Sequence, residues 1–550
     1  NRIETHESGT APCKTACPAH VAVQGYLKLA AQGRYDEALA LIKRENPLPA
    51  ICGRVCNRRC EDACTRGRVD AAVAIDEVKK FIAQRDLDAA TRYVPPVVTP
   101  TRAGGFDQKI AIIGAGPAGL SCAFYLAEKG YKPVVFEKNE RPGGMLTYGI
   151  PSFKLQKDVI EAEVEVIRLM GAEFRYGVEV GRDVTLDELR AQGFKAFYVA
   201  IGCQGGRLAG IPGEDAEDVT VAVDFLREVN SGKIDALPGH TIVVGGGNVA
   251  IDVARNACRL GSEHVEMFCL ESEAQMPASE EERREAIEDG AHISCGWGPK
   301  EVHLDEAGRV CGITFKRCMR VFDDEGRFAP EYDENDLRRV DADRVVMSIG
   351  QSIVWGDLLA GSKVELGRGQ GALADPQTYQ TAEPDIFVGG DVYTGPSFAI
   401  DAIAAGHEAA VSIHRFVQPG STLTIGRSQR RYTALDRDDV VIESYDNASR
   451  EVAHVDRERE KAAPFSEYVE TFTEEQVRAE TARCLGCGAS IVDPNKCIGC
   501  GLCTTKCAFD AIHLDRDRPE CSTMVKYEQK LPSLGKYALK RAIKIKFGRK

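Results

Sequence analysis

Apolar residues recur at helical spacing near the start of the chain and form short continuous runs in its centre. Residues 21–43 place apolar side chains three and four positions apart, which predicts amphipathic helices. Residues 110–113 (IAII) and 241–244 (TIVV) are apolar runs followed by glycines and then by an amphipathic segment. Such runs are typical of strands buried in a parallel sheet. The pattern therefore predicts α/β domains preceded by a small helical domain.

The first apolar run leads into a glycine motif typical of dinucleotide binding. Gly114, Gly116 and Gly119 follow the strand and open the next helix. The first glycine permits a tight turn, the second lets the backbone approach a pyrophosphate, and the third lets helix pack on strand. Glu137 ends the second strand, where a carboxylate can bind both hydroxyls of a ribose. A glycine turn without a ligand is the alternative, and the complete strand, turn, helix, strand and acid argue against it.

A second unit of this kind begins at residue 241. Gly245 and Gly247 lie between a strand and a helix, with Ala250 in the third small position. Glu271 follows the next strand, and no arginine stands there to meet a 2'-phosphate, so the charge favours NAD(H) over NADP(H). The alternative is that Glu271 is a solvated loop charge. Two such units predict two bound nucleotides.

A flavin-type signal follows the second unit. In the segment IFVGGDVYTGPS, Asp391 follows a buried strand and precedes a helix expected to begin near Pro396. An acid at such a strand end can bind the ribityl hydroxyls of a flavin, while the helix faces the isoalloxazine ring. Because this signal comes after the second unit, the sequence predicts that the second nucleotide domain is inserted in the first.

Cysteine is concentrated near the two ends of the chain, which hold 13 of the 20 cysteines. Disulfides suit small secreted scaffolds, whereas a large nucleotide-binding centre without a secretion signal favours metal or cluster ligands. Cys497, Cys500, Cys503 and Cys507 have the spacing of bacterial ferredoxins, although Ala508 replaces the usual proline. A zinc ribbon is the alternative, but zinc sites usually separate two CxxC pairs by a longer loop.

Three closely spaced thiolates fit one face of a [4Fe-4S] cube, and the fourth cysteine of such a run often serves a neighbouring cluster. We therefore expect at least two [4Fe-4S] clusters, one of them at Cys497, Cys500 and Cys503. The cysteines available for a second cluster at this end are Cys484, Cys487, Cys507 and Cys521.

Composition and charge restrict the classes of protein that fit. No run of eighteen apolar residues occurs and no secretion signal opens the chain, which argues against a membrane span and a secreted precursor. The net charge of -13 argues against binding to nucleic acid. We expect a cytoplasmic protein, and because the chain opens on Asn1 rather than Met, we expect further sequence before it.

The chain resembles the glutamate synthase small-subunit family, which is shared with the N-terminal half of dihydropyrimidine dehydrogenase and the large subunit of ferredoxin-dependent transhydrogenase. The resemblance covers residues 11–420 and rests on the motifs CKTACP, NPLPAICGRVCNRRCEDAC, GAGPAGL, ERPGGMLTYGIPSFKL, GGGNVAIDVARNACRLG, MPA and GGDVYTGP. It implies an N-terminal helical iron–sulfur domain followed by FAD and nicotinamide domains.

The expected fold is α/β, with two Rossmann-like nucleotide-binding domains, an N-terminal helical iron–sulfur domain and a C-terminal ferredoxin-like module. A Pro- and Gly-rich stretch forms the first linker, and a charge-rich stretch is expected to be a solvated connector. The expected parts are the helical domain 1–85, linker 86–108, FAD domain 109–238, NAD(P) domain 239–350, second part of the FAD domain 351–420, connector 421–480, ferredoxin-like module 481–522 and basic tail 523–550.

The resemblance also implies which residues bind the nucleotides. FAD contacts are implied at Gly116, Ala118, Glu137, Gly144, Leu146 and Asp391, and contacts with the nicotinamide dinucleotide at Gly247, Asn248 and Val249. The full set of expected cofactor-binding residues is Gly114, Gly116, Pro117, Ala118, Gly119, Glu137, Lys138, Gly144, Met145, Leu146, Gly149, Ile150, Gly202, Gly245, Gly247, Asn248, Val249, Glu271, Gly350, Gly390, Asp391 and Ser397.

The helical domain departs from the family in its ligands. The relatives' first CxxC pair is absent there, and Lys79 stands near the position of a Gln or Glu ligand, although a protonated lysine cannot bind iron. A segment similar to the one that carries the missing pair lies near the other end, with Cys484 and Cys487. The resemblance matches Cys17, Cys56 and Cys60 to one cluster and Cys13 and Cys64 to the other. It matches Cys52 to a cysteine that is not a ligand in relatives, and recruitment of Cys52 as a ligand stays open.

A second departure concerns the dinucleotide. NADPH-using relatives carry an arginine pair before the MPA motif, where this chain has Leu270 and Glu271, so NADH is favoured again. We expect NADH to transfer a hydride to FAD, a step that needs orientation rather than a catalytic side chain. Electrons would then pass through the clusters to a partner subunit or a ferredoxin in a hetero-oligomeric complex, and the reverse direction is equally compatible.

Three other functions are alternatives to this one. A glutamate synthase small subunit stays open, although the ferredoxin-like segment and Glu271 argue against it. A dithiol reductase needs a CxxC pair beside the flavin, and residues 109–420 contain none. Two intact nucleotide units argue against a non-enzymatic iron–sulfur assembly subunit. The basic end, residues 536–550, is expected to be either a solvated helix or a docking segment for an acidic partner.

Overall fold

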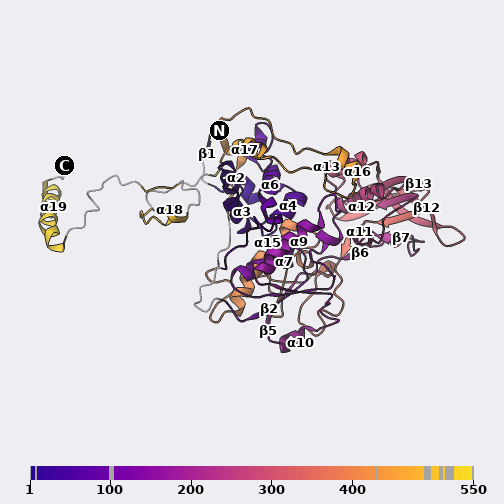
Figure 1. Ribbon diagram of the computed structural model, residues 1–550, viewed down its shortest axis with the longest axis horizontal. Coiled ribbons are helices and arrows are strands. Elements are labelled where there is room, and N and C mark those ends of the chain that lie inside the picture. The colour runs from indigo at the N-terminus through magenta and orange to yellow at the C-terminus, as the bar shows by residue number, and fades with distance from the viewer. Residues whose placement is uncertain are drawn as a thin grey trace. The chain divides into compact units, whose positions relative to one another are not determined.

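The chain forms two compact units, Asn1–Ala489 and Ser490–Lys550. Figure 1 labels their helices and strands on a computed structural model, coloured from indigo at the N-terminus to yellow at the C-terminus. The structure describes residues 2–5, 9–97, 105–427, 432–488, 497–506, 512–514 and 526–547.

The first nucleotide-binding domain is built on a parallel sheet. Its strands are, in spatial order, β16 (Ile386–Val388), β5 (Phe194–Val199), β2 (Lys109–Ile113), β3 (Val134–Glu137) and β4 (Glu173–Tyr176). All residues of β2 after Lys109 are buried, as expected for a strand covered on both faces. β16 follows the second nucleotide domain in sequence but pairs with β5. The second domain is therefore inserted in the first, as the sequence predicts.

Two long helices of this domain pack against each other and against the sheet. They are α7 (Pro117–Glu128), which follows the first glycine motif, and α15 (Ala399–Val417). A Cβ atom on Gly406 of α15 would lie 2.2 Å from the carbonyl oxygen of Ala118, so only glycine allows this approach. The other helices of the domain are α8 (Met145–Tyr148), α9 (Lys157–Leu169), α10 (Leu186–Ala191) and α14 (Asp391–Thr394).

The second nucleotide-binding domain contains a parallel and an antiparallel sheet. The parallel strands are, in spatial order, β10 (His292–Cys295), β9 (His264–Cys269), β8 (His240–Val244), β14 (Arg344–Met347) and β7 (Val219–Val221). Because β7 belongs to this sheet, the domain begins before the expected residue 239. The antiparallel strands are β11 (Trp297–Leu304), β12 (Val310–Phe322) and β13 (Phe328–Val340), and the helices are α11 (Ala222–Asn230), α12 (Asn248–Arg259) and α13 (Glu280–Glu288).

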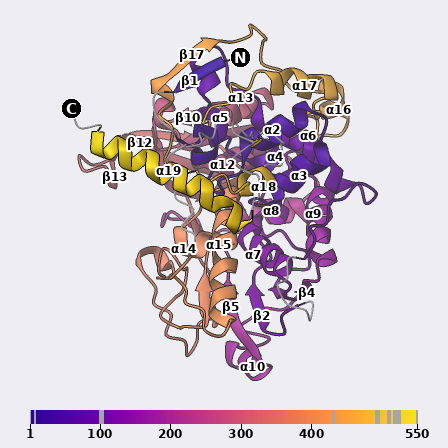
Figure 2. The ribbon, with the colours of Figure 1, turned by 90° about the vertical axis from the view of Figure 1, so that its left-hand side faces the viewer.

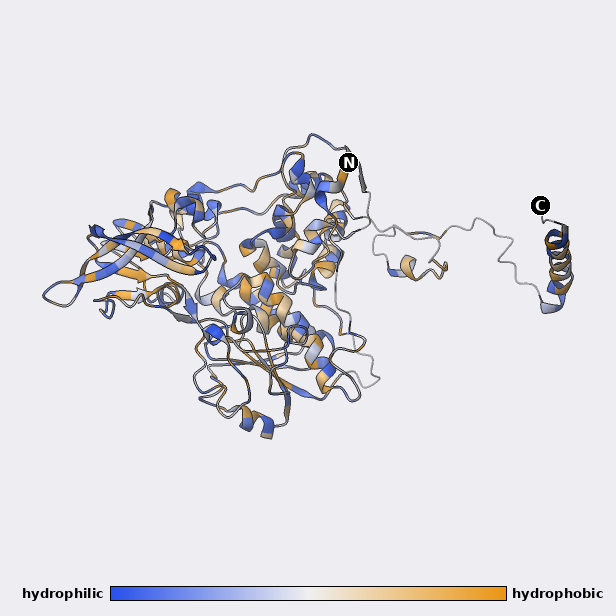
Figure 3. Cartoon of the chain, turned by 180° about the vertical axis from the view of Figure 1, so that it is seen from behind, coloured by the Kyte–Doolittle hydropathy of each residue, from blue (hydrophilic) through white to orange (hydrophobic). Residues whose placement is uncertain are grey.

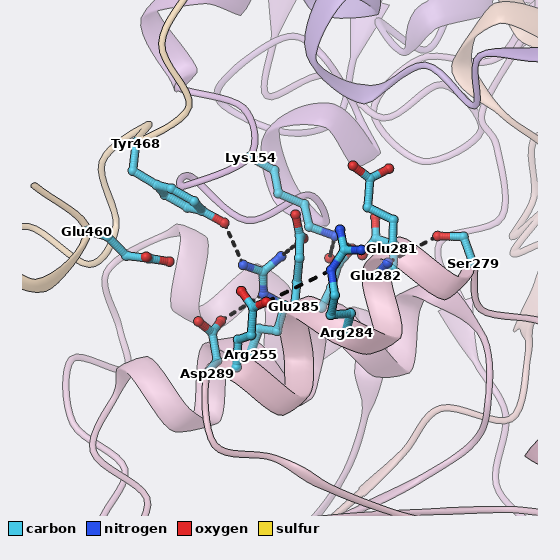
Figure 4. Close-up of polar contacts among 12 residues, drawn as sticks. Lys154, Arg255, Ser279, Glu281, Glu282, Arg284, Glu285, Asp289, Glu460 and Tyr468 are labelled. Carbon is cyan, nitrogen blue, oxygen red and sulfur yellow. Dashed lines mark hydrogen bonds and ion pairs between the residues drawn. The ribbon is translucent and has the colours of Figure 1, made fainter. Parts of the chain in front are cut away.

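The two nucleotide domains are joined by a short sheet and an ion pair. The chain leaves the first domain through β6 (Gly205–Gly206) and returns through β15 (Gln351–Ser352), and these two strands pair antiparallel. Lys154, from the loop before α9, lies with its Nζ 2.6 Å from Asp252 Oδ1 on α12. Figure 4 shows Lys154 pointing toward the charged side chains of the inserted domain. This contact fixes one domain against the other.

The N-terminal helices form a domain that also includes a segment from far along the chain. Its helices are α1 (Pro12–Ala16), α2 (Val23–Ala31), α3 (Tyr35–Lys43), α4 (Pro49–Val55), α5 (Arg59–Asp62) and α6 (Ile75–Leu87). The side chains of Leu29, Leu39 and Ile42 are completely buried among them. α17 (Glu474–Ala482) packs against α2 and α6. β1 (Arg2–Thr5) pairs antiparallel with β17 (Val440–Ser444), as Figure 2 shows.

The connector expected at residues 421–480 is solvated only in part, because several of its side chains pack against the rest of the first unit. Tyr468, Phe472 and Val477 are buried. The Tyr468 hydroxyl accepts a hydrogen bond of 2.7 Å from Arg255 on α12, a contact visible in Figure 4. The segment also contains α16 (Arg457–Ala462). Its many charges predict a solvated segment, but Glu460 forms a largely buried ion pair with Arg259 of the inserted domain, and Arg457 forms an exposed one with Glu288.

Four charged residues fix the end of α17 to the helical domain, and we call them the Arg483 ion cluster: Arg66, Asp70, Glu480 and Arg483. The side chains of both arginines and of Glu480 are completely buried. Arg483 pairs with Glu480 at 2.6 Å and with Asp70 at 3.0 Å, and Arg66 pairs with Asp70 at 2.7 Å. Glu480 also accepts a hydrogen bond of 2.7 Å from the amide of Ala74, which precedes α6. The cluster therefore joins the two ends of the first unit.

The second unit contains α18 (Leu502–Lys506) and α19 (Tyr527–Phe547). The described side chains of α19 are exposed, among them Leu531, Leu539 and Ile543. Figure 3 shows hydrophobic and hydrophilic positions mixed along this helix, which ends beside the C label. None of the helices in the described residues is long and apolar enough to cross a membrane.

The substitution Arg483→Met tests the Arg483 ion cluster. We expect the free energy of opening of α17 to fall by about 3 kcal/mol or more, because Glu480 and Asp70 lose their buried partner. Hydrogen-exchange mass spectrometry of the peptide that covers α17 measures this change. The control is Arg478→Met on the same helix, whose exposed pair with Glu474 is worth about 0.5 kcal/mol or less. Equal protection in the two variants would contradict the prediction.

Candidate functional site

A pocket of about 240 Å³ lies where three parts of the first unit meet. The inserted domain contributes Leu226, Val249 and Asp252 to its wall, and the helical domain contributes Val55, which directly precedes Cys56. The expected cofactor-binding residues that line it are Gly114, Gly116, Pro117, Ala118, Glu137, Gly144, Met145, Leu146, Gly149, Ile150, Gly202, Val249, Gly390, Asp391 and Ser397.

The first glycine motif forms one end of this pocket. Gly114 has φ +104°, and a Cβ atom there would lie 2.4 Å from the carbonyl oxygen of Ala200. A Cβ atom on Gly119 would lie 1.9 Å from the Gly114 carbonyl oxygen, so the fold itself requires both glycines. A Cβ atom on Gly116 would meet no atom within 4 Å. Gly116 thus leaves space in the pocket wall, as a backbone that approaches a pyrophosphate must.

Glu137 lies at the end of β3 and is buried against the glycine loop. Its carboxylate accepts hydrogen bonds of 2.8 Å from the amide of Ala115 and 2.9 Å from the amide of Asn139. These bonds fix the loop and hold the carboxylate at the pocket, where the sequence predicts a ribose. Lys138 lines a smaller neighbouring pocket together with Gly114 and Gly202.

Asp391 lies on the other side of the pocket, as the first residue of α14. The helix expected near Pro396 is α15, which begins at Ala399. Burial raises the pKa of Asp391 to about 6, although its carboxylate accepts a hydrogen bond of 3.3 Å from the Ser397 amide. Hydroxyl donors of a bound sugar chain would favour the charged form of this carboxylate. The site therefore fits the ribityl chain that the sequence predicts.

The second glycine motif lies between β8 and α12; its Val249 lines this pocket, whereas Gly245 and Gly247 are not among the lining residues. A Cβ atom on Gly245 would lie 2.2 Å from the carbonyl oxygen of Ser348, whereas one on Gly247 would meet no atom within 4 Å. A Cβ atom on Gly246 would lie 3.1 Å from the carboxylate of Glu271. Glu271 is therefore positioned over the glycine loop and is not a remote loop charge.

The MPA motif is attached to the same loop. The side-chain oxygen of Asn248 accepts a hydrogen bond of 3.1 Å from the Ser279 amide. The Gly246 carbonyl oxygen accepts one of 3.0 Å from the Ala278 amide. The MPA motif therefore holds the glycine loop in place.

Gly350, another expected cofactor-binding residue, has φ +119° and follows the parallel strand β14. It precedes Gln351, which lines the larger pocket.

Four cysteines from the two ends of the first unit face one small cavity: Cys13, Cys64, Cys484 and Cys487. Burial raises the pKa of Cys484 to about 11, and its neighbours Cys487 and Cys64 add to the rise. Burial and the neighbouring Cys484, Cys64 and Cys487 likewise raise the pKa of Cys13. Iron would supply the positive charge that four converging thiolates need. The donor set therefore fits a [4Fe-4S] cluster.

This grouping bears on the ligands that the sequence leaves available for a second cluster at the C-terminal end. Of those four cysteines, Cys484 and Cys487 lie beside Cys13 and Cys64, whereas Cys507 and Cys521 lie outside the described residues. The Arg483 ion cluster instead holds Cys484 and Cys487 in the helical domain, so the expected module start at residue 481 differs from the structure. The sequence signal for the observed pairing was the similarity of this segment to the one that precedes the helical domain in relatives.

A second group of cysteines in the helical domain comprises Cys17, Cys56 and Cys60 beside Lys79. Lys79 is buried and forms an ion pair with Asp76 on the same helix. Burial raises the pKa of Cys56 and of Cys60, and the Lys79 ammonium opposes both rises. A cation thus occupies the region of the relatives' fourth ligand, as the sequence indicates. These residues do not form a complete set of four ligands.

The ferredoxin-like run lies in the second unit. Cys497, Cys500 and Cys503 are exposed, in the loop before α18 and on α18 itself. Over the described parts of the chain, no three His, Cys, Asp or Glu side chains are arranged to hold a single metal ion. A cubane is wider than one ion, because its thiolates bind at different corners.

Several pocket residues were missed by sequence reasoning, among them Val55, Asp252 and Phe398. Asp252 lies one helical turn after Val249, so helical periodicity could have found it. Phe398 directly follows the expected Ser397. Val55 had no local signal, because it comes from another domain.

An ion pair attaches α5 of the helical domain to α15, which begins at the pocket. The Arg59 guanidinium donates to both carboxylate oxygens of Asp401 at 2.8 and 3.1 Å.

Comparison with known families identifies the class of protein that this fold and pocket define. Residues 108–406 match the pyridine nucleotide-disulphide oxidoreductase family. Residues 6–91 match the family described as dihydropyrimidine dehydrogenase domain II, 4Fe-4S cluster, and residues 490–513 match the 4Fe-4S binding domain. The chain belongs to the pyridine nucleotide-disulphide oxidoreductase family, with iron–sulfur domains at both ends.

Individual relatives are subunits of larger redox enzymes. The NADP(+)-dependent formate dehydrogenase subunit beta of Moorella thermoacetica is 35% identical over 87% of this chain and 70% of its own length. The glutamate synthase [NADPH] small chain of Escherichia coli K12 is 35% identical over 74% of this chain and 89% of its own. The NAD-dependent dihydropyrimidine dehydrogenase subunit PreT of Escherichia coli O157:H7 is 32% identical over 74% and 91%.

These matches confirm the resemblance inferred from the motifs and the expected fold class. The chain is an FAD-dependent oxidoreductase that carries iron–sulfur domains. Its relatives include NADP-dependent and NAD-dependent enzymes, so the choice of dinucleotide depends on the residues of this chain.

Proposed function

We propose that the chain passes electrons between NAD(H) and a partner subunit or ferredoxin-type carrier, by way of FAD and [4Fe-4S] clusters. One observation carries this proposal: the large pocket has walls from both nucleotide-binding domains and from the cysteine-rich helical domain. A pocket built in this way can bring a hydride donor, a flavin and a one-electron carrier together. The chemistry that FAD supplies when bound is exchange of a hydride with nicotinamide and of single electrons with clusters.

Different residues of the pocket would bind different parts of FAD. Gly116 leaves room for the pyrophosphate, Glu137 is available to the ribose hydroxyls, and Asp391 to the ribityl chain. Val249 and Asp252 belong to the inserted domain and line the same pocket. The second glycine motif would therefore hold a dinucleotide beside the pocket whose residues would hold the flavin. Orientation is the main task of these side chains, since hydride transfer needs no protein acid or base.

The first test of this function is anaerobic mixing of the holoprotein with NADH. We expect the flavin absorbance to bleach at the rate of NADH oxidation and the clusters to become reduced afterwards, as measured by stopped-flow absorbance and electron paramagnetic resonance. In the Cys500→Ala variant, flavin reduction should persist while transfer to an external ferredoxin stops. Flavin that NADH does not reduce would contradict the proposal.

Glu271 supports NADH as the physiological dinucleotide. Its carboxylate lies over the glycine loop, where it can bind the hydroxyls of an adenosine ribose and would repel a 2'-phosphate. Two of the relatives are named for NADP(+) and NADPH and a third for NAD, so we base the preference for NADH on the charge of Glu271 in this chain.

The substitution Glu271→Arg tests this assignment. We expect the ratio of kcat/KM for NADH to that for NADPH to fall by about tenfold or more, because a charge-assisted hydrogen bond is lost and a phosphate partner is gained. Flavin reduction by each dinucleotide measures the ratio. The exposed Glu273, two residues further on, provides the matched control Glu273→Arg, which should leave the ratio unchanged. A wild-type protein that prefers NADPH would refute the role of Glu271.

We propose two [4Fe-4S] clusters with distinct ligands. One is bound by Cys13, Cys64, Cys484 and Cys487, whose thiols face a common cavity. The other is bound by Cys497, Cys500 and Cys503 in the second unit. A partner subunit fits this arrangement, because the relatives named above are themselves subunits.

Iron analysis of anaerobically purified protein tests the ligand assignment. The wild type should hold about eight iron atoms per chain, and Cys64→Ser and Cys484→Ser should each lose about four. The double variant should lose no more than either single variant, because both cysteines serve the same cluster. Cys258→Ser in the inserted domain is the control and should lose none. Losses that add in the double variant would show that Cys64 and Cys484 serve different clusters.

A further inference from the structure

The inserted domain holds a pair of thiols that the electron route does not use. Cys269 ends β9 and Cys295 ends β10, and the two residues are partners in the parallel register. Their sulfur atoms lie 3.6 Å apart. Cys269 is buried and Cys295 is half-buried, so the pair can be reached from the Cys295 side.

The backbone already has the spacing that a disulfide needs. Neighbouring strands of a sheet lie about 4.8 Å apart, and the Cα atoms of bridged cysteines are usually about 4.4 to 6.8 Å apart. The sulfurs must approach each other by about 1.5 Å to reach the bond length of about 2.05 Å. A shift of the two side chains can supply this movement while the strands keep their pairing.

Both cysteines lie next to backbone that positions Glu271, the acid proposed to bind the dinucleotide. A Cβ atom on Gly246 would lie 2.9 Å from the Cβ of Cys269 and 3.1 Å from the carboxylate of Glu271. Gly296, the residue after Cys295, donates its amide to the Glu271 carbonyl oxygen at 3.0 Å. A bond between the two sulfurs would therefore pull on both backbone segments that position Glu271.

We propose that Cys269 and Cys295 form a reversible disulfide that lowers the affinity of the chain for its dinucleotide. The inference rests on the dinucleotide site assigned under the proposed function. The oxidant is a peroxide. The Cys295 sulfur attacks a peroxide oxygen to give a sulfenic acid and one water. The Cys269 sulfur then attacks the Cys295 sulfur, which forms the disulfide and releases the sulfenic hydroxyl as a second water. Two thiols and one hydrogen peroxide thus yield one disulfide and two waters, and a low-molecular-weight dithiol reverses the step.

Burial raises the pKa of Cys269, which keeps that thiol protonated at neutral pH. Cys295 is the more exposed of the two and is therefore the first site of oxidation. Cys318 lies close by, because its amide donates to the Gly296 carbonyl oxygen at 2.9 Å, but its thiol donates to the Arg320 carbonyl oxygen at 3.5 Å. The pairing of Cys269 with Cys295 is thus favoured over a pairing with Cys318.

The experiment compares dithiothreitol-reduced holoprotein with the same protein after treatment with hydrogen peroxide, both under argon. Peptide mass mapping without reduction should find Cys269 linked to Cys295. Stopped-flow flavin reduction at varied NADH concentration should show an apparent Kd raised about fivefold or more, with the limiting rate unchanged, and dithiothreitol should reverse the rise. The Cys295→Ser variant should bind NADH like the reduced wild type and should not respond to peroxide.

Peroxide can also damage the clusters, and the controls separate that effect. The Cys295→Ser variant carries the same clusters, and Cys311→Ser removes a half-buried thiol of the same domain that should leave the response intact. A disulfide that forms without changing the Kd, a link that includes Cys318, or equal loss of affinity in Cys295→Ser would overturn the proposal. Reduced wild type whose flavin NADH fails to reduce would instead overturn the proposed function on which this inference rests.

Discussion

Buried ion pairs hold the two ends of the first unit together, and the cysteine sites of the helical domain depend on them. Removing Arg66, Arg483 and Glu480 from water is costly, and close pairing with hydrogen bonds is what offsets that cost. Arg483 pairs with Asp70 and Glu480 and also donates to the carbonyl oxygens of Ala71 and Ala448, and these contacts together fix the position of the residues that follow. Cys484 is the next residue, and it therefore comes to face Cys13 and Cys64. The four-thiol cavity requires both ends of the unit to be present.

The helical domain is fixed with similar precision to the flavin-binding part. Glu163 on α9 is completely buried and accepts hydrogen bonds of 2.7 and 3.0 Å from the amides of Ala50 and Ile51 at the start of α4. Burial raises the pKa of Glu163 to about 8, which the two amides oppose. α4 ends at Val55 in the wall of the large pocket. One carboxylate thus sets where the cysteine-bearing end of α4 meets the flavin site.

The sequence allowed much of the nucleotide-binding centre to be predicted, because its signals are local. Gly114, Gly119 and Gly245 occupy positions where a Cβ atom would collide with backbone, and the order of the motifs along the chain indicates that the second domain is inserted in the first. Long-range contacts were harder to predict. The charges of residues 421–480 look like a solvated stretch in sequence, since nothing local reveals that Tyr468 will pack on Arg255. Val55 reaches the pocket from another domain for the same reason.

The two cysteine groups of the helical domain differ in their balance of charge, and this difference bears on the electron route. The cavity of Cys13 and Cys484 gathers four thiols, and burial together with the neighbouring cysteines raises the pKa of both, so a bound cation would be needed to hold all four as thiolates. Beside Cys56 the Lys79 ammonium already supplies a positive charge, balanced by Asp76. A side chain thus supplies the positive charge beside the second group, whereas the donor set of the first group fits a bound cluster. Because Cys56 follows Val55, the group that contains Lys79 adjoins the wall of the large pocket.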